Sequence, residues 1–163
     1  MEVNNLQDLL VDELRDIYSA EKQILKALPK MAKKASNPDL KSAFEEHLDQ
    51  TEGHVDRLEQ IFDQFGKKPT GKTCAAMKGL VEEGQEIMSE DMEEDTMDAA
   101  LIAAAQKIEH YEIASYGTVR TWAQLLGNEE AAKLLQQTLD EEGQTDKKLT
   151  TLAEKLINVK AQA

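Results

Sequence analysis

The sequence predicts an all-α protein built as a four-helix bundle, and three observations support this prediction. The 163 residues include only 3 Pro and 8 Gly, so few positions interrupt a helix. Aromatic residues make up 4% of the chain, and clusters of aromatic or β-branched residues that would indicate strands are missing. Four long segments repeat apolar residues at steps of three and four, which is the period of an amphipathic helix. A chain of this length is expected to form one domain over residues 1–163.

The first predicted helix covers about residues 6–34, with an apolar stripe that runs from Leu10 to Met31. A carboxylate, Glu21, stands in the middle of this stripe, where the period calls for an apolar residue. The following SNPD stretch ends this helix and begins the next, because Pro38 is favoured in a first helical turn.

The second predicted helix covers about residues 38–65 and has its polar gap at Thr51. His47 and His54 lie one turn to either side of this threonine, on nearly the same face. Each is either a ligand or a hydrogen-bonded histidine. Glu52 lies on the flank, where it either reaches inward or stays in solvent.

A long connection separates the second helix from the third. The stretch GKKPTGK, residues 66–72, predicts a loop because it contains two glycines and a proline. The apolar pattern from Cys74 to about Ser89 predicts an extra short helix. The acidic run that follows predicts a connector, with Asp95 or Thr96 near the N-cap of the third helix. Such a crossover is typical of a bundle made of two antiparallel helical hairpins.

Two carboxylates interrupt the third predicted helix, residues 97–126. Glu109 and Glu112 lie one turn apart and follow an alanine-rich run, residues 99–105, that predicts a buried helix face.

The fourth predicted helix begins at about Glu129 and has a similar gap at Glu142. Thr145 and Asp146 follow within the next turn. The last residues, 158–163, offer nothing to bury, so we expect them to fray.

Polar gaps near the middle of each helix reach the same height in a bundle of antiparallel hairpins. Ionised carboxylates buried together are unstable, so they must be protonated or bind a multivalent cation. Iron or manganese held by oxygen and imidazole ligands is the solution that helical bundles use. Alternatively, each stripe is shifted by one residue and the carboxylates are solvated. The expected metal ligands are Glu21, His54, Glu109, Glu112 and Glu142, with His47, Glu52 and Asp146 as further candidates.

The net charge of −13 disfavours nucleic acids and anionic membranes as partners. The polar start MEVNNLQDLL lacks the features of a signal peptide, and no apolar run approaches the roughly 20 residues that span a bilayer. We therefore expect a soluble, cytoplasmic protein. No nucleophile elbow, phosphate-binding glycine loop or zinc-type Cys/His spacing occurs, so hydrolase and nucleotide-binding functions have no support.

The sequence resembles the YciE/YciF family of ferritin-like bacterial stress proteins over nearly its whole length. The most specific stretches are DIYSAEKQ (residues 16–23), AALIAAAQKIEHYEIASYGT (residues 99–118) and LDEE (residues 139–142). The resemblance implies a ferritin-like, rubrerythrin-related bundle that forms a homodimer and can hold a dinuclear centre of iron or manganese.

The same resemblance implies ligand positions. Thr51 stands where the second helix of such centres offers Glu, and Thr145 stands where the fourth helix offers His. The positions that match the ligands of the related proteins are Glu21, Glu109, Glu112 and Glu142.

Two functions from different classes are consistent with these features. The first is a stress-response protein that binds iron or manganese in the bundle centre and carries out redox chemistry with oxygen or peroxide. The alternative is a non-enzymatic structural or interaction protein that keeps the fold without a metal, its central glutamates protonated or hydrogen-bonded to threonine and tyrosine hydroxyls. An iron-storage cage is a third option, which would require large assembly surfaces.

Overall fold

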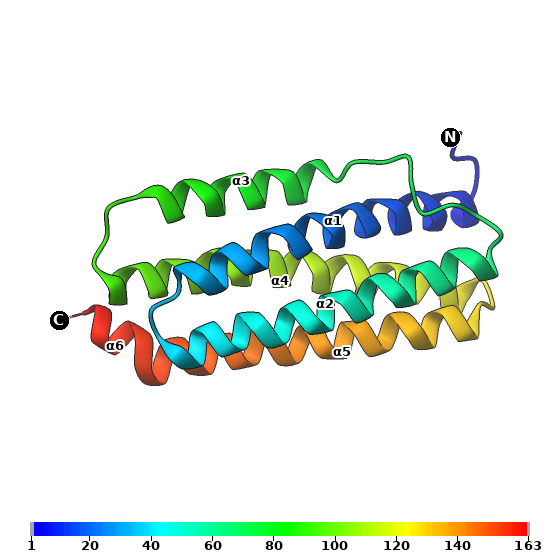
Figure 1. Ribbon diagram of the computed structural model, residues 1–163. Coiled ribbons are helices and arrows are strands. Elements are labelled where there is room, and N and C mark those ends of the chain that lie inside the picture. Colours follow the sequence, from blue (N-terminus) through cyan, green and yellow to red (C-terminus); the bar gives the residue numbers. More distant parts are fainter. Residues whose placement is uncertain (1, 163) are drawn as a thin grey trace.

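The computed structural model describes residues 2–162, and within this range the chain forms helices and no strand. Four long helices lie along one another, and a shorter one covers part of the bundle (Figure 1). The helices are α1 (Leu6–Lys34), α2 (Pro38–Gln64), α3 (Ala75–Ser89), α4 (Glu94–Leu125), α5 (Glu129–Leu152), the π-helical turn η1 (Ala153–Ile157) and α6 (Asn158–Ala161).

The long helices form two antiparallel hairpins, α1 with α2 and α4 with α5 (Figure 1). The bundle closes because α1 also packs along α4, and α2 along α5. The connection between the hairpins runs the length of the bundle and contains α3, which packs on α1 and α4. The predicted all-α bundle of two hairpins with an extra crossover helix is therefore confirmed.

The third long helix begins earlier than the sequence predicted. Residues 95–96, expected near its N-cap, lie in the first turn of α4, and the N-cap is Glu93. The acidic run can continue as helix because negative side chains are favoured near a helix N-terminus. The buried Asp98 of this helix accepts hydrogen bonds from the backbone N–H groups of Ser36 and Asn37, both at 2.8 Å. Asp98 thus fixes the turn between α1 and α2 against α4.

The C-terminal residues also differ from the prediction, because helix continues through α6 to Ala161 where fraying was expected. No residue of α6 is buried, as the sequence indicated. The segment before it is anchored, since Leu149, Ala153 and Ile157 continue the apolar stripe of α5 into the core. The helix therefore extends beyond the residues that hold it in place.

The apolar core is divided into two clusters along the bundle. One cluster, which includes Ile24 and Phe44, lies toward the turn between α1 and α2. The other, which includes Leu14 and Leu58, lies toward the opposite end. The polar gaps of the long helices fall between the two clusters.

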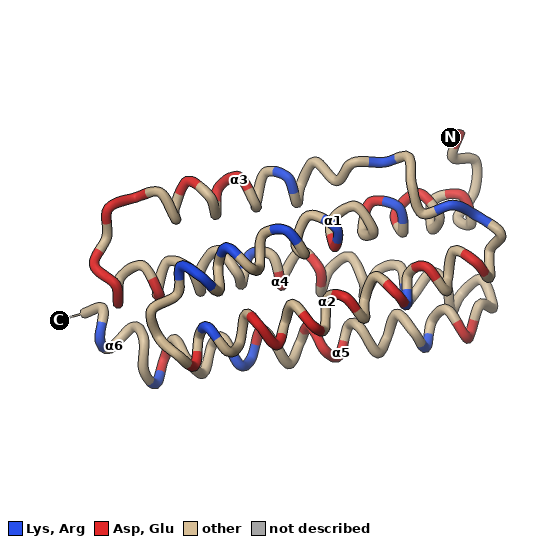
Figure 2. Tube along the Cα trace, in the orientation of Figure 1, with Lys and Arg blue, Asp and Glu red and all other residues tan. Residues whose placement is uncertain are grey.

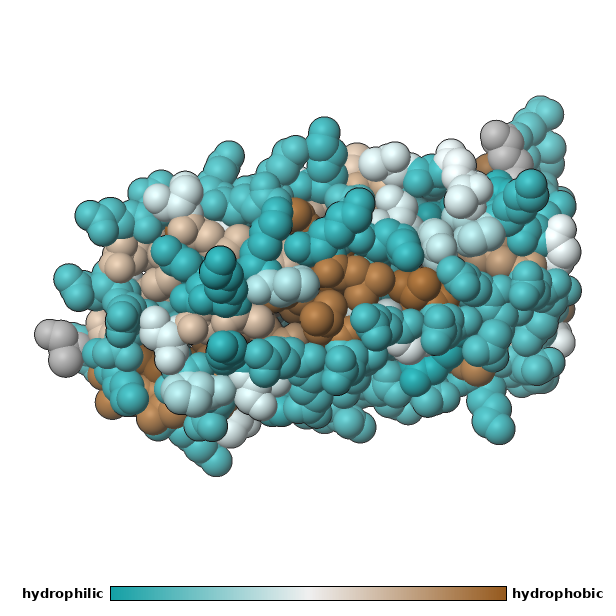
Figure 3. Space-filling model, viewed as in Figure 1, coloured by the Kyte–Doolittle hydropathy of each residue, from teal (hydrophilic) through white to brown (hydrophobic). Residues whose placement is uncertain are grey.

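The outer surface is mostly hydrophilic, with an apolar strip along the face shown in Figure 3. Acidic residues are dense along α3 and in the connector that follows it (Figure 2). Among residues 2–162, no helix has both the length and the apolar character required to cross a membrane.

Candidate metal centre

A cluster of six buried polar side chains crosses the middle of the bundle. None of the six is more than 3% exposed. Helices α1 and α5 each supply one of these side chains, and α2 and α4 each supply two, so every long helix contributes. The cluster consists of Glu21, His47, His54, Glu109, Glu112 and Glu142.

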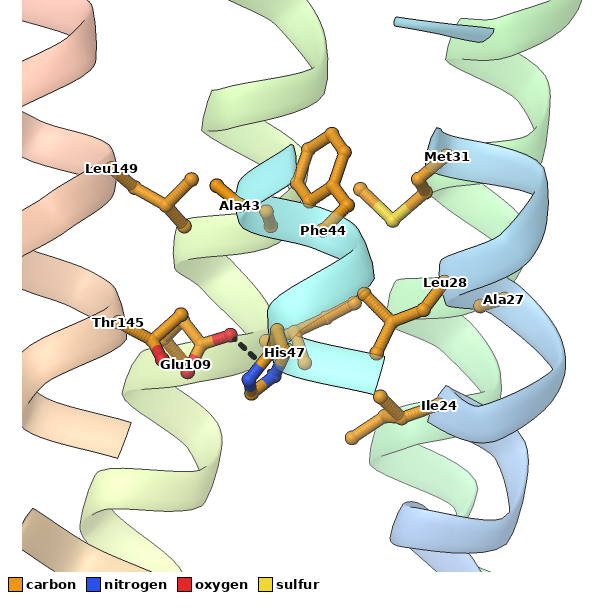
Figure 4. Close-up of a pocket in the computed structure, with 12 residues that line it drawn as sticks. Ile24, Ala27, Leu28, Met31, Ala43, Phe44, His47, Glu109, Thr145 and Leu149 are labelled. Atoms are coloured by element: carbon orange, nitrogen blue, oxygen red, sulfur yellow. Dashed lines mark ion pairs between the residues drawn. The ribbon is translucent and has the colours of Figure 1, made fainter. Parts of the chain in front are cut away.

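His47 defines one end of this cluster. Its Nε2 atom lies 2.9 Å from Oε1 of Glu109 and 3.9 Å from Oε2 of Glu142. Figure 4 shows the imidazole of α2 facing the Glu109 carboxylate of α4. One ligand atom each from His47, Glu109, Glu112 and Glu142 can be chosen so that all lie within 4.8 Å of one another. This is a compact group of one nitrogen and three oxygen ligands.

His54 defines the other end. Its Nδ1 atom lies 2.9 Å from Oε1 of Glu142 and 3.2 Å from Oε1 of Glu21. Ligand atoms of these three residues also lie within 4.8 Å of one another. The Glu142 carboxylate belongs to both groups, with one oxygen near each histidine, so it lies where a bridging ligand would.

The orientation of His54 is set by a carboxylate outside the cluster. Its Nε2 atom lies 2.9 Å from Oε2 of Glu141, and Arg57 donates to both oxygens of Glu141 at 2.8 and 2.7 Å. Burial would raise the pKa of Glu141, but the hydrogen bonds and charge of Arg57 hold it below its usual value. An ionised carboxylate only accepts hydrogen bonds, so the His54 proton on this side belongs to Nε2. In the neutral ring, Nδ1 then keeps its lone pair toward Glu21 and Glu142.

Sequence reasoning missed Glu141 and Arg57. Glu141 directly precedes Glu142, and Arg57 lies one turn after His54, so spacing alone could have suggested both as supporting groups. The buried Tyr116 lies one turn after Glu112 and donates its hydroxyl to Oε1 of Glu21 at 2.5 Å.

Most of the polar atoms in the cluster have no hydrogen-bond partner. Nε2 of His47 and Nδ1 of His54 each lie 2.9 Å from a carboxylate oxygen but form no hydrogen bond there. Buried polar groups without partners are rare in folded proteins and indicate a missing ion or water. The unpartnered atoms are Oε2 of Glu21, both nitrogens of His47, Nδ1 of His54, Oε2 of Glu109, and both carboxylate oxygens of Glu112 and Glu142.

Protons compete for the same atoms when no metal is bound. Burial, together with the charge of Glu142, holds the pKa values of Glu109 and Glu112 well above their usual range. Burial would lower the pKa of each histidine, but the nearby carboxylates outweigh it and raise the pKa to about 9 for His47 and about 10 for His54. Burial would raise the pKa of Glu142, but its close contacts with Glu109 and His54 and the charges of both histidines lower it to about 2. At neutral pH the metal-free cluster therefore holds several protons around an ionised Glu142.

Two of the candidate ligands lie outside the cluster. Glu52 is exposed on α2. Asp146 turns outward, with its Oδ1 atom 3.2 Å from Nε2 of the exposed His110 and 3.2 Å from the amide nitrogen of Gln106. The structure brings together the five main candidates and His47, and leaves these two apart.

The two threonines at the positions of missing ligands bond elsewhere. Thr51 donates to the backbone carbonyl of His47 at 2.8 Å, and Thr145 donates to Oε1 of Gln50 at 3.2 Å. Of the hydroxyl contacts expected in a metal-free protein, the structure has the one from Tyr116 to Glu21.

Comparison with solved structures identifies the type of bundle. A ferritin-like, diiron-carboxylate protein from Bacillus anthracis strain Ames superposes with a TM-score of 0.71 over 92% of this chain and 99% of that chain. The two sequences are only 18% identical, so the likeness is one of fold. The predicted ferritin-like architecture is confirmed.

Closer relatives match almost the entire chain. Residues 5–162 match the family described as a domain of unknown function, DUF892. The protein YciF of Escherichia coli strain K12 is 47% identical over 163 residues, which cover 99% of this chain and 98% of YciF.

Two solved structures of such relatives share the same architecture. The crystal structure of the E. coli stress protein YciF gives a TM-score of 0.90 at 48% identity, over 93% of this chain and 96% of that one. The structure of YcfI from Rhodopseudomonas palustris gives a TM-score of 0.89 at 44% identity, over 92% of this chain and 96% of that one. The chain therefore belongs to the DUF892 family, and its similarity to YciF confirms the family resemblance predicted from the sequence.

Proposed function

We propose that this protein binds two divalent ions of iron or manganese in the middle of the bundle. The observation that carries the proposal is the set of buried nitrogen and oxygen atoms without hydrogen-bond partners, which converge from four helices. Mixed carboxylate and imidazole ligands suit iron and manganese.

Charge balance supports two ions. The four glutamates of the cluster carry four negative charges when ionised, and two divalent cations with two neutral imidazoles neutralise them. Without such cations, buried carboxylates at this spacing stay ionised only at a cost of several kcal/mol each. The acidic chain, with a net charge of −13, also attracts cations.

The two ligand groups define where the ions would be held. His47, Glu109 and Glu112 would hold one ion, Glu21 and His54 would hold the other, and Glu142 would bridge them. The chain itself orients His54 through Glu141 and excludes bulk water, since no residue of the cluster is more than 3% exposed. Bound iron or manganese would supply redox chemistry toward oxygen or peroxide, and we propose protection against oxidative stress as the role.

Metal analysis tests this proposal. Protein produced with added iron and manganese should contain roughly two ions per chain, one for each ligand group, and Glu142→Ala should lose both. Glu52→Ala, which removes an exposed carboxylate from α2, is the matched control and should keep them. Wild-type protein that stays free of metal after prolonged soaking in either ion would overturn the proposal.

The alternative function, a structural or interaction protein without a metal, is supported by two contacts. Tyr116 donates to Glu21, and Glu141 pairs with His54, so part of the cluster is satisfied by the chain itself. Under this alternative, protons take the place of the ions. A ligand that binds only the folded state raises its melting temperature, so the alternative requires a melting temperature that neither manganese, iron nor a chelator changes.

We further propose that the protein is a cytoplasmic homodimer. The homodimer follows from the family resemblance. Sedimentation equilibrium separates a dimer from a monomer and from a large cage.

A further inference from the structure

A surface recess lies between α2 and α5 beside the His47 end of the cluster. Its volume is about 150 Å³, enough for a few water molecules. Three polar residues of α2 and three of α5 line it, at the same spacing on each helix. These residues are Glu46, His47 and Gln50 on α2, and Gln144, Thr145 and Lys148 on α5.

A second, smaller cavity lies on the inner side of this recess. Its volume is about 10 Å³ and its walls are mostly apolar, with His47, Glu109 and Thr145 as the polar exceptions (Figure 4). This is close to the smallest space that holds one water-sized molecule. Ala43, His47 and Thr145 line both cavities, so these three residues form the partition between the surface recess and the buried cluster.

The recess is bridged by two contacts between α2 and α5. Thr145 donates to Oε1 of Gln50 at 3.2 Å, and Lys148 forms an ion pair with Glu46. The opposite charges of this ion pair cancel, and the remaining polar groups are two amides, a hydroxyl and the imidazole of His47, which is only 3% exposed. The lining therefore favours small uncharged molecules over ions.

The partition is nearly closed. Only 3% of His47 and 8% of Thr145 is exposed, so no organic substrate of ordinary size can pass without movement of the helices. The Nδ1 atom of His47 is buried and has no hydrogen-bond partner. A small polar molecule that passed Thr145 would therefore meet a free ring nitrogen.

We infer that this recess is the entrance through which uncharged molecules of about the size of water reach the His47 end of the cluster, with the hydrogen bond between Thr145 and Gln50 as its gate. One consequence rests on the proposed function. The partition would then admit oxidants as small as peroxide or dioxygen to ions held in the cluster and would exclude organic substrates.

Deuterium exchange at the Cε1–H positions of the histidines, followed by mass spectrometry on the metal-free protein, tests the entrance directly. The chain offers two internal references, because the His110 side chain is 69% exposed and that of His54 is fully buried. His47 should exchange at a rate between these two. Measuring exchange as a function of pH separates two effects. The access of solvent to the ring sets the plateau rate of exchange, and the proton affinity of the imidazole sets the pH at the midpoint of the profile.

Variants at the gate sharpen the test. Gln50→Ala and Thr145→Val remove the hydrogen bond, and each should accelerate exchange at His47 several-fold while His54 and His110 stay unchanged. Thr145→Leu fills more of the space between the two cavities and should slow exchange at His47. Gln136→Ala, which removes a similar amide contact to Asp140 elsewhere on α5, is the control and should change none of the three rates.

The outcome for the entrance is independent of metal binding. The inference of an entrance is overturned if His47 exchanges as slowly as His54 in the wild type and in every gate variant. A responsive His47 in a protein that binds neither iron nor manganese leaves the entrance in place and overturns the proposed function instead.

Discussion

The Nε2 atom of His54 lies 2.9 Å from the Oε2 atom of Glu141, which leaves Nδ1 of this imidazole facing the buried carboxylates. A carboxylate behind a histidine fixes the ring orientation and raises its basicity as a ligand. Glu141 is itself held by both terminal guanidinium nitrogens of Arg57. The ligand geometry at His54 therefore depends on a residue that would not touch the metal.

We expect Glu141→Ala to weaken metal binding by roughly 10- to 100-fold, the usual cost of losing such a supporting contact. The ligands themselves remain, so saturating metal should still give the wild-type stoichiometry. Competition titration with a chelator of known affinity measures the change. Asp140→Ala removes the neighbouring exposed carboxylate and serves as the control. Equal affinities for the two variants would show that Glu141 does not support the site.

Tyr116 contributes to the stability of the metal-free protein through its hydrogen bond to Glu21. Tyr116→Phe keeps the buried ring but leaves the carboxylate without its donor, so we expect the free energy of unfolding to fall by about 1–3 kcal/mol. Urea denaturation in the presence of a chelator measures this difference. Tyr18→Phe, which removes a hydroxyl bonded to Glu59 at the surface, should lower the free energy of unfolding by less. Similar losses in both variants would argue against a special role for Tyr116.

Metal affinity should rise with pH between about pH 6 and pH 9. Metal ligands must be deprotonated, and the pKa values of about 9 for His47 and about 10 for His54 mean that both hold protons over most of this range. Binding should therefore release protons. Calorimetric titration in two buffers with different ionisation enthalpies counts them. An affinity that does not change across this range, with no proton release, would contradict the assignment of both histidines as ligands.

The stability of the metal-free protein should have the opposite pH dependence. A histidine pKa raised from 6.5 to about 9 or 10 stabilises the fold fully below about pH 6.5, and this stabilisation is lost as the pH rises through the raised values. The raised pKa values of Glu109 and Glu112 act in the same direction. We expect the melting temperature in chelator to fall by several degrees between about pH 6.5 and pH 10. His110→Asn, a change at an exposed histidine, should leave this profile unchanged.

The stability of the protein at acid pH depends on Glu142. Its pKa is lowered from 4.5 to about 2, so its contribution is present above about pH 4.5 and is lost as the pH falls toward 2. Glu142→Gln removes this contribution, and the melting temperature of the variant should therefore fall less steeply below pH 4.5 than that of the wild type. Parallel profiles for the two proteins in that range would contradict the lowered pKa.

Helical periodicity predicted much of the candidate site. An apolar stripe fixes which face of a helix is buried, so carboxylates within the stripe, such as Glu21 and Glu142, had to lie in the core. Periodicity is less informative at the edge of a stripe. Glu52, on the flank of the α2 stripe, was open to either placement and is exposed, whereas His47, one turn before Thr51, is buried.

The sequence by itself determined the helices, their pairing into two hairpins and the depth at which the carboxylates meet, because these follow from local periodicity and loop length. The tertiary structure decided which neighbour each side chain faces. It placed the imidazole of His47 beside Glu109, turned Asp146 outward to His110, and set Glu141 behind His54. These contacts depend on how α2, α4 and α5 are rotated and spaced against one another, which is the result of packing between helices and is not encoded in the period of any single one.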